Sequence, residues 1–260
     1  MKRLFSFSFL VFSFLAGAAL TQDGPLKIEI TDGVIEPLSF AVPVFEAENP
    51  AAREIASEIS SIVVADLTSS GLFREIPKNR FIAQRKTFEE PVRFPDWRAV
   101  NAQALVTAAV KTNGSGQLTV KFRIFDIFSG VQLGKGTQLS GSTGAARRMA
   151  HQVADQVYKR ITGEGAYFDS RIVFVSESGP KDKRLKRLAI MDSDGEKMKF
   201  LTGNDNIVLA PRISSDGKKV LYTSWETGFP QIYLLDVETG RRKRVNTPGN
   251  DVAFSPRFSP

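Results

Sequence analysis

The spacing of hydrophobic residues changes along the chain, and each change marks a new type of predicted structure. Residues Leu38 to Phe45 favour a strand, although Pro43 has no N–H to donate and belongs at a strand end or edge. After Asn49-Pro50, with the Asn predicted as N-cap, apolar residues recur at the spacing of one helix face: Ile55, Ile59, Ile62, Val63 and Leu67. Ser70-Gly71 is the predicted end of this helix.

The following segment is predicted to alternate strands and helices. A short strand over 73–76 precedes a helix over 97–103. Two strands over 104–110 and 118–124 flank Asn113-Gly114-Ser115-Gly116, which is typical of a β-hairpin. The second of these strands alternates apolar and polar residues, so we expect one of its faces to be partly exposed.

A third strand over 131–139 leads into the last predicted helix, over 145–161. The face predicted to be buried consists of residues at helical spacing: Ala150, Val153, Ala154, Val157 and Ile161. His151, the single histidine of the chain, falls opposite this face and is predicted to be solvated. Together these elements indicate an α/β domain over residues 34–165.

Beyond Tyr167 the helical spacing stops and short strand patterns repeat. Ala210-Pro211-Arg212-Ile213-Ser214 returns as Ser255-Pro256-Arg257-Phe258-Ser259, with the prolines 45 positions apart. In the same way 171–176 matches 219–224, and 188–192 matches 232–236. A period of about 40 to 45 residues with several strands in each unit is typical of β-propeller blades.

Residues 166–260 therefore predict two blades and the start of a third. Propellers close with about four to eight blades, so we expect the chain to be the N-terminal part of a longer protein. We also expect the blade half to be loose or aggregation-prone by itself, because its last sheet lacks a covering neighbour.

The N-terminus has the pattern of an export signal. Met1-Lys2-Arg3 supplies the positive charge, and 4–15 is an apolar run too short to span a bilayer. Small residues follow, and cleavage is predicted after Ala18 or Ala19. We therefore assign residues 1–18 to a signal peptide, and we expect an exported mature protein and no membrane anchor.

Composition removes several classes of chemistry. The chain has no cysteine, so disulfides and thiolate chemistry are excluded. The formal charge of +7 includes Lys2 and Arg3, and the basic runs 181–187 and 241–244 lie in predicted turns or flanking strands. Because the protein is exported, we expect no nucleic-acid partner.

No catalytic or metal-binding motif is evident. One histidine does not support a histidine metal cluster or a Ser-His-Asp triad, and there is no Gly-x-Ser-x-Gly or phosphate loop. Asp192-Ser193-Asp194-Gly195 begins like a calcium loop but lacks the later acidic ligands, so a turn is predicted. Trp225 and Phe229 are candidates for a binding surface, whereas Tyr233 is expected to pack between blades. We predict no catalytic residue, metal or cofactor.

The repeat, with its Ser-Pro or Ser-Asp-Gly-Lys-Lys turns, resembles the WD40-like β-propeller family. The order of the parts is similar to that of the TolB family of the Tol-Pal system, over nearly the whole chain after the signal peptide. The resemblance rests on the signal peptide, the repeats and these stretches: 26–34, Val42-Pro43-Val44-Phe45, Val64-Ala65-Asp66-Leu67, Ser70-Gly71-Leu72-Phe73 and Thr162-Gly163.

This resemblance implies an α/β domain followed by a six-bladed propeller, incomplete here, in a periplasmic, non-catalytic and monomeric coupler. It implies that residues 19–33 form an arm that binds the periplasmic domain of TolA and that the propeller binds the lipoprotein Pal, so that membranes are contacted only through partners. The residues carried over for TolA are Leu26, Lys27, Ile28, Glu29, Ile30, Thr31, Asp32 and Gly33.

Two alternatives remain open from the residues. Similar repeats form the propeller of exported serine peptidases, whose hydrolase domain would follow residue 260. A propeller that binds envelope glycans or metals is the other reading, and no ligand cluster in the sequence supports it.

Overall fold

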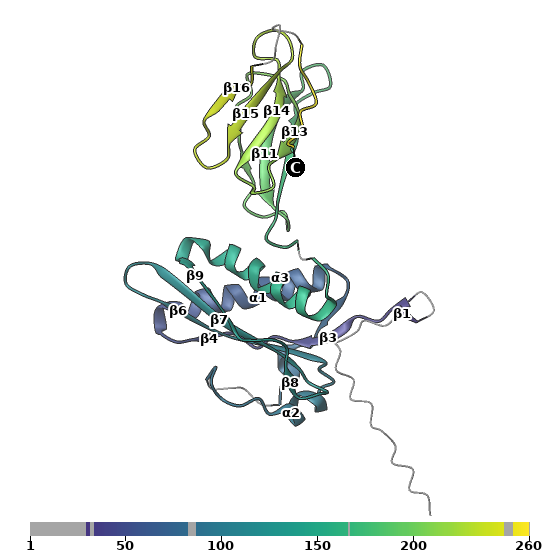
Figure 1. The fold of residues 1–260 in the computed structure, drawn as a ribbon, viewed down its shortest axis with the longest axis vertical. Coiled ribbons are helices and arrows are strands. Elements are labelled where there is room, and N and C mark those ends of the chain that lie inside the picture. The colour runs from purple at the N-terminus through teal and green to yellow at the C-terminus, as the bar shows by residue number, and fades with distance from the viewer. Residues whose placement is uncertain (1–29, 32–33, 83–86, 166, 247–251, 260) are drawn as a thin grey trace, which may run out of the picture.

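The computed structural model describes residues 30–31, 34–82, 87–165, 167–246 and 252–259. Figure 1 shows an α/β domain and, beyond it, two small sheets stacked as propeller blades. The blades do not close a ring, which fits an incomplete propeller. The described helices include none with the length and hydropathy needed to cross a membrane.

A mixed sheet organises the α/β domain. Its described strands run in the order β5-β3-β6-β7-β8, with β4 paired to β6 and β9 paired to β7. Pairing is parallel among β3, β4, β5 and β6 and antiparallel from β6 onward. The strand bounds are β3 Leu38–Ala41, β4 Glu46–Ala47, β5 Phe73–Glu75, β6 Ala104–Thr112, β7 Gln117–Asp126, β8 Val131–Gln132 and β9 Thr137–Ser142.

Helices α1 (Arg53–Ser69) and α3 (Ala146–Thr162) pack side by side on one face of this sheet (Figure 1). Alternate residues of β6, among them Val106 and Val110, point into the core beneath these helices. On the opposite face, Leu105 packs with Trp97 of the short helix α2 (Phe94–Ala99). The predicted apolar face of α3 is buried in the main core.

The predicted hairpin is confirmed, since β6 and β7 pair in register from Ala104↔Asp126 to Thr112↔Leu118. Two other strand predictions were too long. The strand expected over 38–45 stops at Ala41, before Pro43, and pairing resumes in β4. The strand expected over 131–139 is divided into β8 and β9.

Asn49 does not make the N-cap hydrogen bond that was predicted for it. A 3₁₀ turn over Pro50–Ala52 precedes α1. Instead, Asn49 Nδ2 donates a hydrogen bond of 2.5 Å to the carbonyl of Thr112. The side chain therefore ties the start of the helix to the end of β6.

The blade strands follow the predicted repeat. One sheet contains β10 (Arg171–Ser178), β11 (Leu185–Asp192) and β12 (Lys199–Phe200), and the next contains β13 (Val208–Ile213), β14 (Lys219–Ser224), β15 (Gln231–Asp236) and β16 (Arg242–Arg244). All neighbours are antiparallel. The matched segments 171–176 and 219–224 occupy equivalent strands, β10 and β14.

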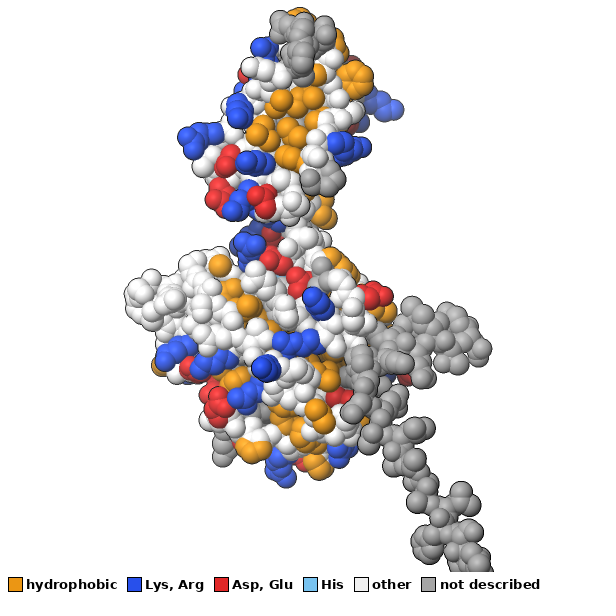
Figure 2. Space-filling view, in the orientation of Figure 1, with side chains coloured by type: hydrophobic (Ala, Val, Ile, Leu, Met, Phe, Trp, Pro, Cys, Tyr) orange, Lys and Arg blue, Asp and Glu red, His pale blue; other side chains and the backbone are white. Residues whose placement is uncertain are grey.

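A small core joins the two blades. It includes Leu188 and Ile190 of the first blade and Val220, Tyr222 and Leu235 of the second. Tyr233, which was expected to pack between blades, belongs to this shared core, but the ring on which it stacks is that of Tyr222 on the neighbouring strand of its own blade, with 5.7 Å between ring centroids. Figure 2 shows hydrophobic side chains exposed together on the blade half, where a stacked unit would cover them.

Candidate functional site

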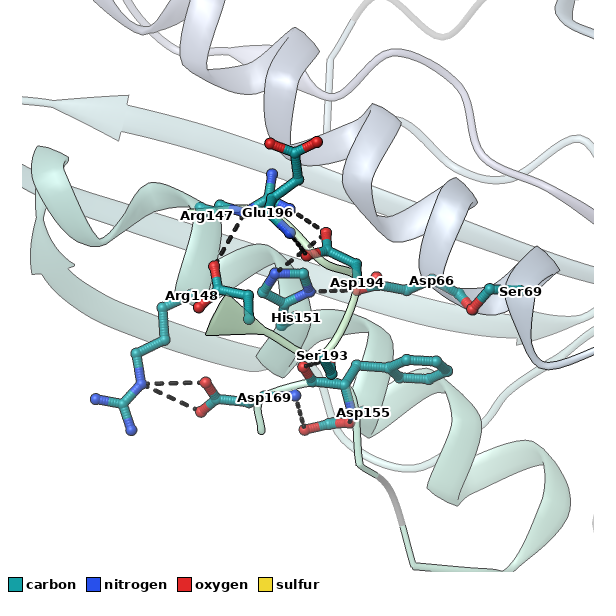
Figure 3. A network of polar contacts seen from close by, with 12 residues as sticks. Asp66, Ser69, Arg147, Arg148, His151, Asp155, Asp169, Ser193, Asp194 and Glu196 are labelled. Atoms are coloured by element: carbon teal, nitrogen blue, oxygen red, sulfur yellow. Dashed lines mark hydrogen bonds and ion pairs between the residues drawn. The ribbon is translucent and has the colours of Figure 1, made fainter. Parts of the chain in front are cut away.

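The residues predicted to bind TolA lie largely outside the described part of the chain. Within it, Ile30–Thr31 forms β1 and pairs antiparallel with β2 (Val34–Ile35). The remaining arm positions, and the cleavage residues Ala18 and Ala19, are outside the described residues. The best-defined candidate site is instead a network of charged side chains where the α/β domain meets the first blade (Figure 3).

His151 lies at the centre of this network. Its side chain is only 3% exposed, and Nδ1 lies 2.7 Å from Oδ2 of Asp66, which is equally buried on α1. The prediction that His151 is solvated was therefore wrong. The apolar stripe of α3 identifies the side that faces the sheet, but α1 covers a second side of the helix.

The first blade reaches the same place through the turn between β11 and β12. Arg147, one turn before His151 on α3, places Nε 3.2 Å from Oδ2 of Asp192, and its Nη2 contacts Asp194. Oδ2 of Asp194 is also 4.0 Å from Nε2 of His151. Arg147 and His151 of one domain thus face two carboxylates of the other.

The predicted turn at Asp192 is confirmed, and its geometry explains how the acids are presented. The N–H of Gly195 donates to the carbonyl of Asp192 at 2.9 Å, and Gly195 has a φ of +89°. Glycine adopts that conformation without strain. The tight turn places Asp192 and Asp194 at the end of the hairpin nearest α3.

The segment between the domains is held on both sides. Oδ1 of Asp155 on α3 accepts from the N–H of Phe168 at 2.7 Å, and Asp169 accepts from Gln152 Nε2 at 2.9 Å. On the blade side, Ser193 Oγ donates to the carbonyl of Phe168 at 2.7 Å. Residues 168–169 therefore bond to α3 and to the same turn that carries Asp194.

These contacts shift the ionisation of the network. Burial by itself lowers the pKa of His151, but the hydrogen bond and charge of Asp66 and the charge of Asp194 outweigh it, so the pKa is raised. Burial raises the pKa of Asp194, yet the N–H of Glu196 and the charges of Arg147 and His151 leave it below its ordinary value. The site therefore favours a charged imidazole and a charged carboxylate.

A cavity of about 660 Å³ lies beside the network, between α3 and the two blades. Its lining includes Arg148, Arg171, Asp169, Asp216 and Glu238. Figure 2 shows acidic and basic side chains gathered at this narrow junction. Mixed charge of this kind suits polar contact between protein surfaces better than a small apolar ligand.

Three of these residues could in principle offer atoms to a metal ion. The ligand atoms of Asp66, His151 and Asp194 lie within 4.8 Å of one another. However, Nδ1 of His151 is engaged by Asp66, and the guanidinium of Arg147 contacts Asp194. The positive charge that a metal would supply is already present, so we interpret the cluster as an ion-pair network.

The network also lacks the arrangement of a hydrolase. The Asp66–His151 pair would need a hydroxyl on the far nitrogen, but Nε2 has no hydrogen-bond partner among the described residues. The nearby hydroxyl of Ser193 is donated to the carbonyl of Phe168. Chemically, the arrangement can hold two domains together and respond to protons.

Asp66 is the residue that sequence reasoning missed. It stands alone among apolar residues in Val63-Val64-Ala65-Asp66-Leu67, and a buried carboxylate needs a partner. That signal could have suggested pairing with the single histidine. The contribution of Asp192 and Asp194 could not be predicted, because the same pattern closes an ordinary hairpin. Of the candidate surface aromatics, Phe229 is exposed and Trp225 is half-buried.

Comparison with known proteins adds independent evidence. A model described as the TolB amino-terminal domain matches residues 26–133, and one described as the TolB beta propeller domain matches residues 158–260. The Tol-Pal system protein TolB of Roseobacter denitrificans is 54% identical over 97% of this chain and 57% of its own length. That of Dinoroseobacter shibae is 57% identical over 93% of this chain and 55% of its own.

A solved structure is similar as well. The crystal structure of TolB from Acinetobacter baumannii matches 80% of this chain and 49% of its own with a TM-score of 0.66 and 28% identity. The chain thus spans just over half the length of the curated relatives named above.

Proposed function

Because the chain belongs to the TolB family, we propose that it is a non-catalytic periplasmic coupler of the Tol-Pal system, which links TolA at the inner membrane to Pal at the outer membrane. The observation that carries the proposal is the succession of the two TolB family models along one chain. Relatives named as Tol-Pal system TolB share more than half of the aligned residues. An export signal at 1–18 and a monomeric mature protein belong to the same proposal.

The arm at residues 19–33 is the proposed contact with TolA. Its described part, Ile30–Thr31, pairs only with β2 in a separate two-stranded sheet. A two-stranded hairpin is marginally stable by itself. Such a segment costs little to detach from its own domain, so a partner can compete for it.

The propeller is the proposed contact with Pal. Blades present their connecting loops at the ends of the ring, where they can form one broad surface. Occupancy of that surface by Pal would bias the arm between a docked and a free state. The coupling free energy between the two partners would then be reciprocal, because each partner changes the affinity for the other equally.

The test separates the two contacts. In the full-length protein, deletion of residues 20–33 should abolish the binding of the TolA periplasmic domain in calorimetry and spare the binding of Pal. A matched control keeps the length and scrambles the order of residues 26–33, and it should also lose TolA. Unchanged affinity for TolA in the deletion would refute the arm assignment.

The alternative, a propeller of an exported serine peptidase, is not favoured. The two relatives named above, each matching more than nine-tenths of the chain, are TolB proteins and not peptidases. Four further repeats and a stop codon after residue 260 are expected in the reading frame. A Gly-x-Ser-x-Gly motif followed by Asp and His would instead favour the peptidase.

A further inference from the structure

We propose that His151 is a proton-dependent interdomain contact: in its charged form it holds the first blade against the α/β domain through Asp194, and loss of its proton weakens this hold. The proposal does not depend on TolA or Pal. It rests on the positions of the two ring nitrogens relative to carboxylates that belong to different parts of the molecule.

Each ring nitrogen of His151 faces a different carboxylate. Nδ1 is 2.7 Å from Oδ2 of Asp66 on α1, and Nε2 is 4.0 Å from Oδ2 of Asp194 in the blade turn. In the neutral ring, Nδ1–H donates to Asp66 and a lone pair on Nε2 points toward a negative charge. In the charged ring both nitrogens carry protons, and both contacts are attractive.

The other charged groups around the ring are consistent with a charged histidine. Asp66 faces it from α1, and Asp192 and Asp194 come from the turn between β11 and β12. Arg147 on α3 opposes protonation of the ring, and Arg148 and Arg171 line the cavity beside it. The hydrogen bond and charge of Asp66 and the charge of Asp194 outweigh this opposition.

Of the two carboxylates that face the ring nitrogens, only Asp194 leaves when the domains separate. Asp66 and Arg147 are part of the α/β domain and remain beside His151, whereas Asp194 moves with the blade. Because Nε2 is buried and has no hydrogen-bond partner among the described residues, its interaction with Asp194 is not replaced by another protein contact. Proton binding and docking of the blade are therefore coupled.

The sign of the pH dependence follows from this coupling. The pKa of His151 is raised, with burial opposing the shift and Asp66 and Asp194 producing it. For folding, a raised pKa means that the contribution is fully present below the ordinary histidine value of about 6.5 and is lost as the pH rises through the raised value. Asp66 stays beside the ring when the blade separates, so only the part of the shift that Asp194 causes favours docking. The docked arrangement should therefore be favoured at pH values below the raised pKa of His151.

The first measurement follows the imidazole itself. In the full-length protein labelled at histidine, the Cε1 proton signal that disappears in His151→Gln belongs to His151, and it should titrate in NMR with a pKa above 6.5. Asp194→Asn should shift that pKa downward. The matched control Asp216→Asn removes a carboxylate from the same cavity without touching the ring and should leave it unchanged. A pKa at or below the ordinary value, or equal effects of the two variants, would overturn the proposal.

The second measurement reports on the domains directly. Residues 1–260 contain no cysteine, so in the full-length protein, with any cysteine beyond residue 260 replaced by serine, the exposed positions Glu58→Cys and Lys243→Cys can carry a fluorescent donor and acceptor. Energy transfer should fall as His151 loses its proton, and His151→Gln and Asp194→Asn should each remove this pH dependence. If His151→Gln does not fold, the comparison of the pH dependence of energy transfer between Asp194→Asn and the parent protein is sufficient to test the proposal. Transfer that stays constant while the histidine titrates would overturn the proposal.

Discussion

At the scale of single residues, the Asp66–His151 pair is the feature with the largest expected effect on stability. Both side chains are 3% exposed, so neither charge is well solvated. Burying an ion pair gives little net stability, but removing one partner leaves the other buried without compensation. The pair therefore matters most for what happens when it is broken.

Asp66→Ala should lower the free energy of unfolding of the α/β domain by about 3 kcal/mol. Denaturant titration followed by circular dichroism in the helical region measures this change. Glu58→Ala, on the exposed side of the same helix, is the matched control and should stay within about 0.5 kcal/mol of the parent. Equal losses in the two variants would mean that the buried pair contributes nothing special.

Sequence analysis could identify many core residues but not this pair. The apolar residues of α3 follow a helical period, and the structure buries them as expected. The burial of His151 could not be predicted in this way. Periodicity distinguishes the side of a helix that faces the sheet from the opposite side, but it does not show that a neighbouring helix covers a further side. Only the third dimension brings positions 66 and 151 together.

At the scale of elements, the ends of α1 and α3 were predicted more accurately from local sequence than the strand ends. The predicted end of α1 at Ser70-Gly71 is confirmed, with Gly71 at a φ of +74°, and Gly163 ends α3 in the same way with a φ of +77°. Strands were less accurate, because a run of apolar residues does not show where pairing stops. Pro43 was recognised as a residue of strand ends or edges, yet the predicted strand was continued past it to Phe45, whereas β3 ends at Ala41.

Gly163→Ala should destabilise the α/β domain by about 1 kcal/mol, because a Cβ disfavours a positive φ even where space is free. The nearest atoms to such a Cβ are beyond 4 Å, so strain and not a clash produces the loss. Thermal unfolding measures it. Gly114→Ala, also in open space but without a positive φ, should leave the melting temperature unchanged or slightly raised. A similar fall in both variants would contradict this explanation.

At the scale of the whole molecule, the junction depends on a small number of charges. Arg147 spans from α3 to two carboxylates of the blade turn, whereas its neighbour Arg148 contacts Asp169, which precedes the first blade strand. The two arginines are adjacent in sequence but differ in what they connect. This difference offers a direct test of which contact holds the blade.

Arg147→Gln should make the junction more accessible to protease, because it removes the ion pairs of Arg147 with Asp192 and Asp194. A glutamate-specific protease that cuts after the exposed Glu164 should act several-fold faster on this variant. Arg148→Gln is the matched control and should be cut at the parental rate. Equal acceleration of cleavage in the two variants would show that the blade is not held through Arg147.

The domain order was predictable from the sequence, and the domain contact was not. Repeats at a period of 45 residues identified the blades, and the strands of both blades confirm the repeat. The repeat identifies only the features that the two blades have in common. The contact with the α/β domain depends on Asp192 and Asp194, which belong to the first blade alone. The acids of the first turn face arginine and histidine because the N-terminal turns of α3 lie beside them.

The turn between β11 and β12 differs in this respect from its counterpart after β15. There, Asp236 Oδ1 accepts from the N–H and hydroxyl of Thr239, each at 2.8 Å, so that acid is satisfied within its own loop. Blades of one repeat are nearly interchangeable, and a ring of them could rest on a neighbour in several rotational positions of similar energy. By turning its acids outward, a single blade removes that degeneracy and gives the ring one preferred orientation.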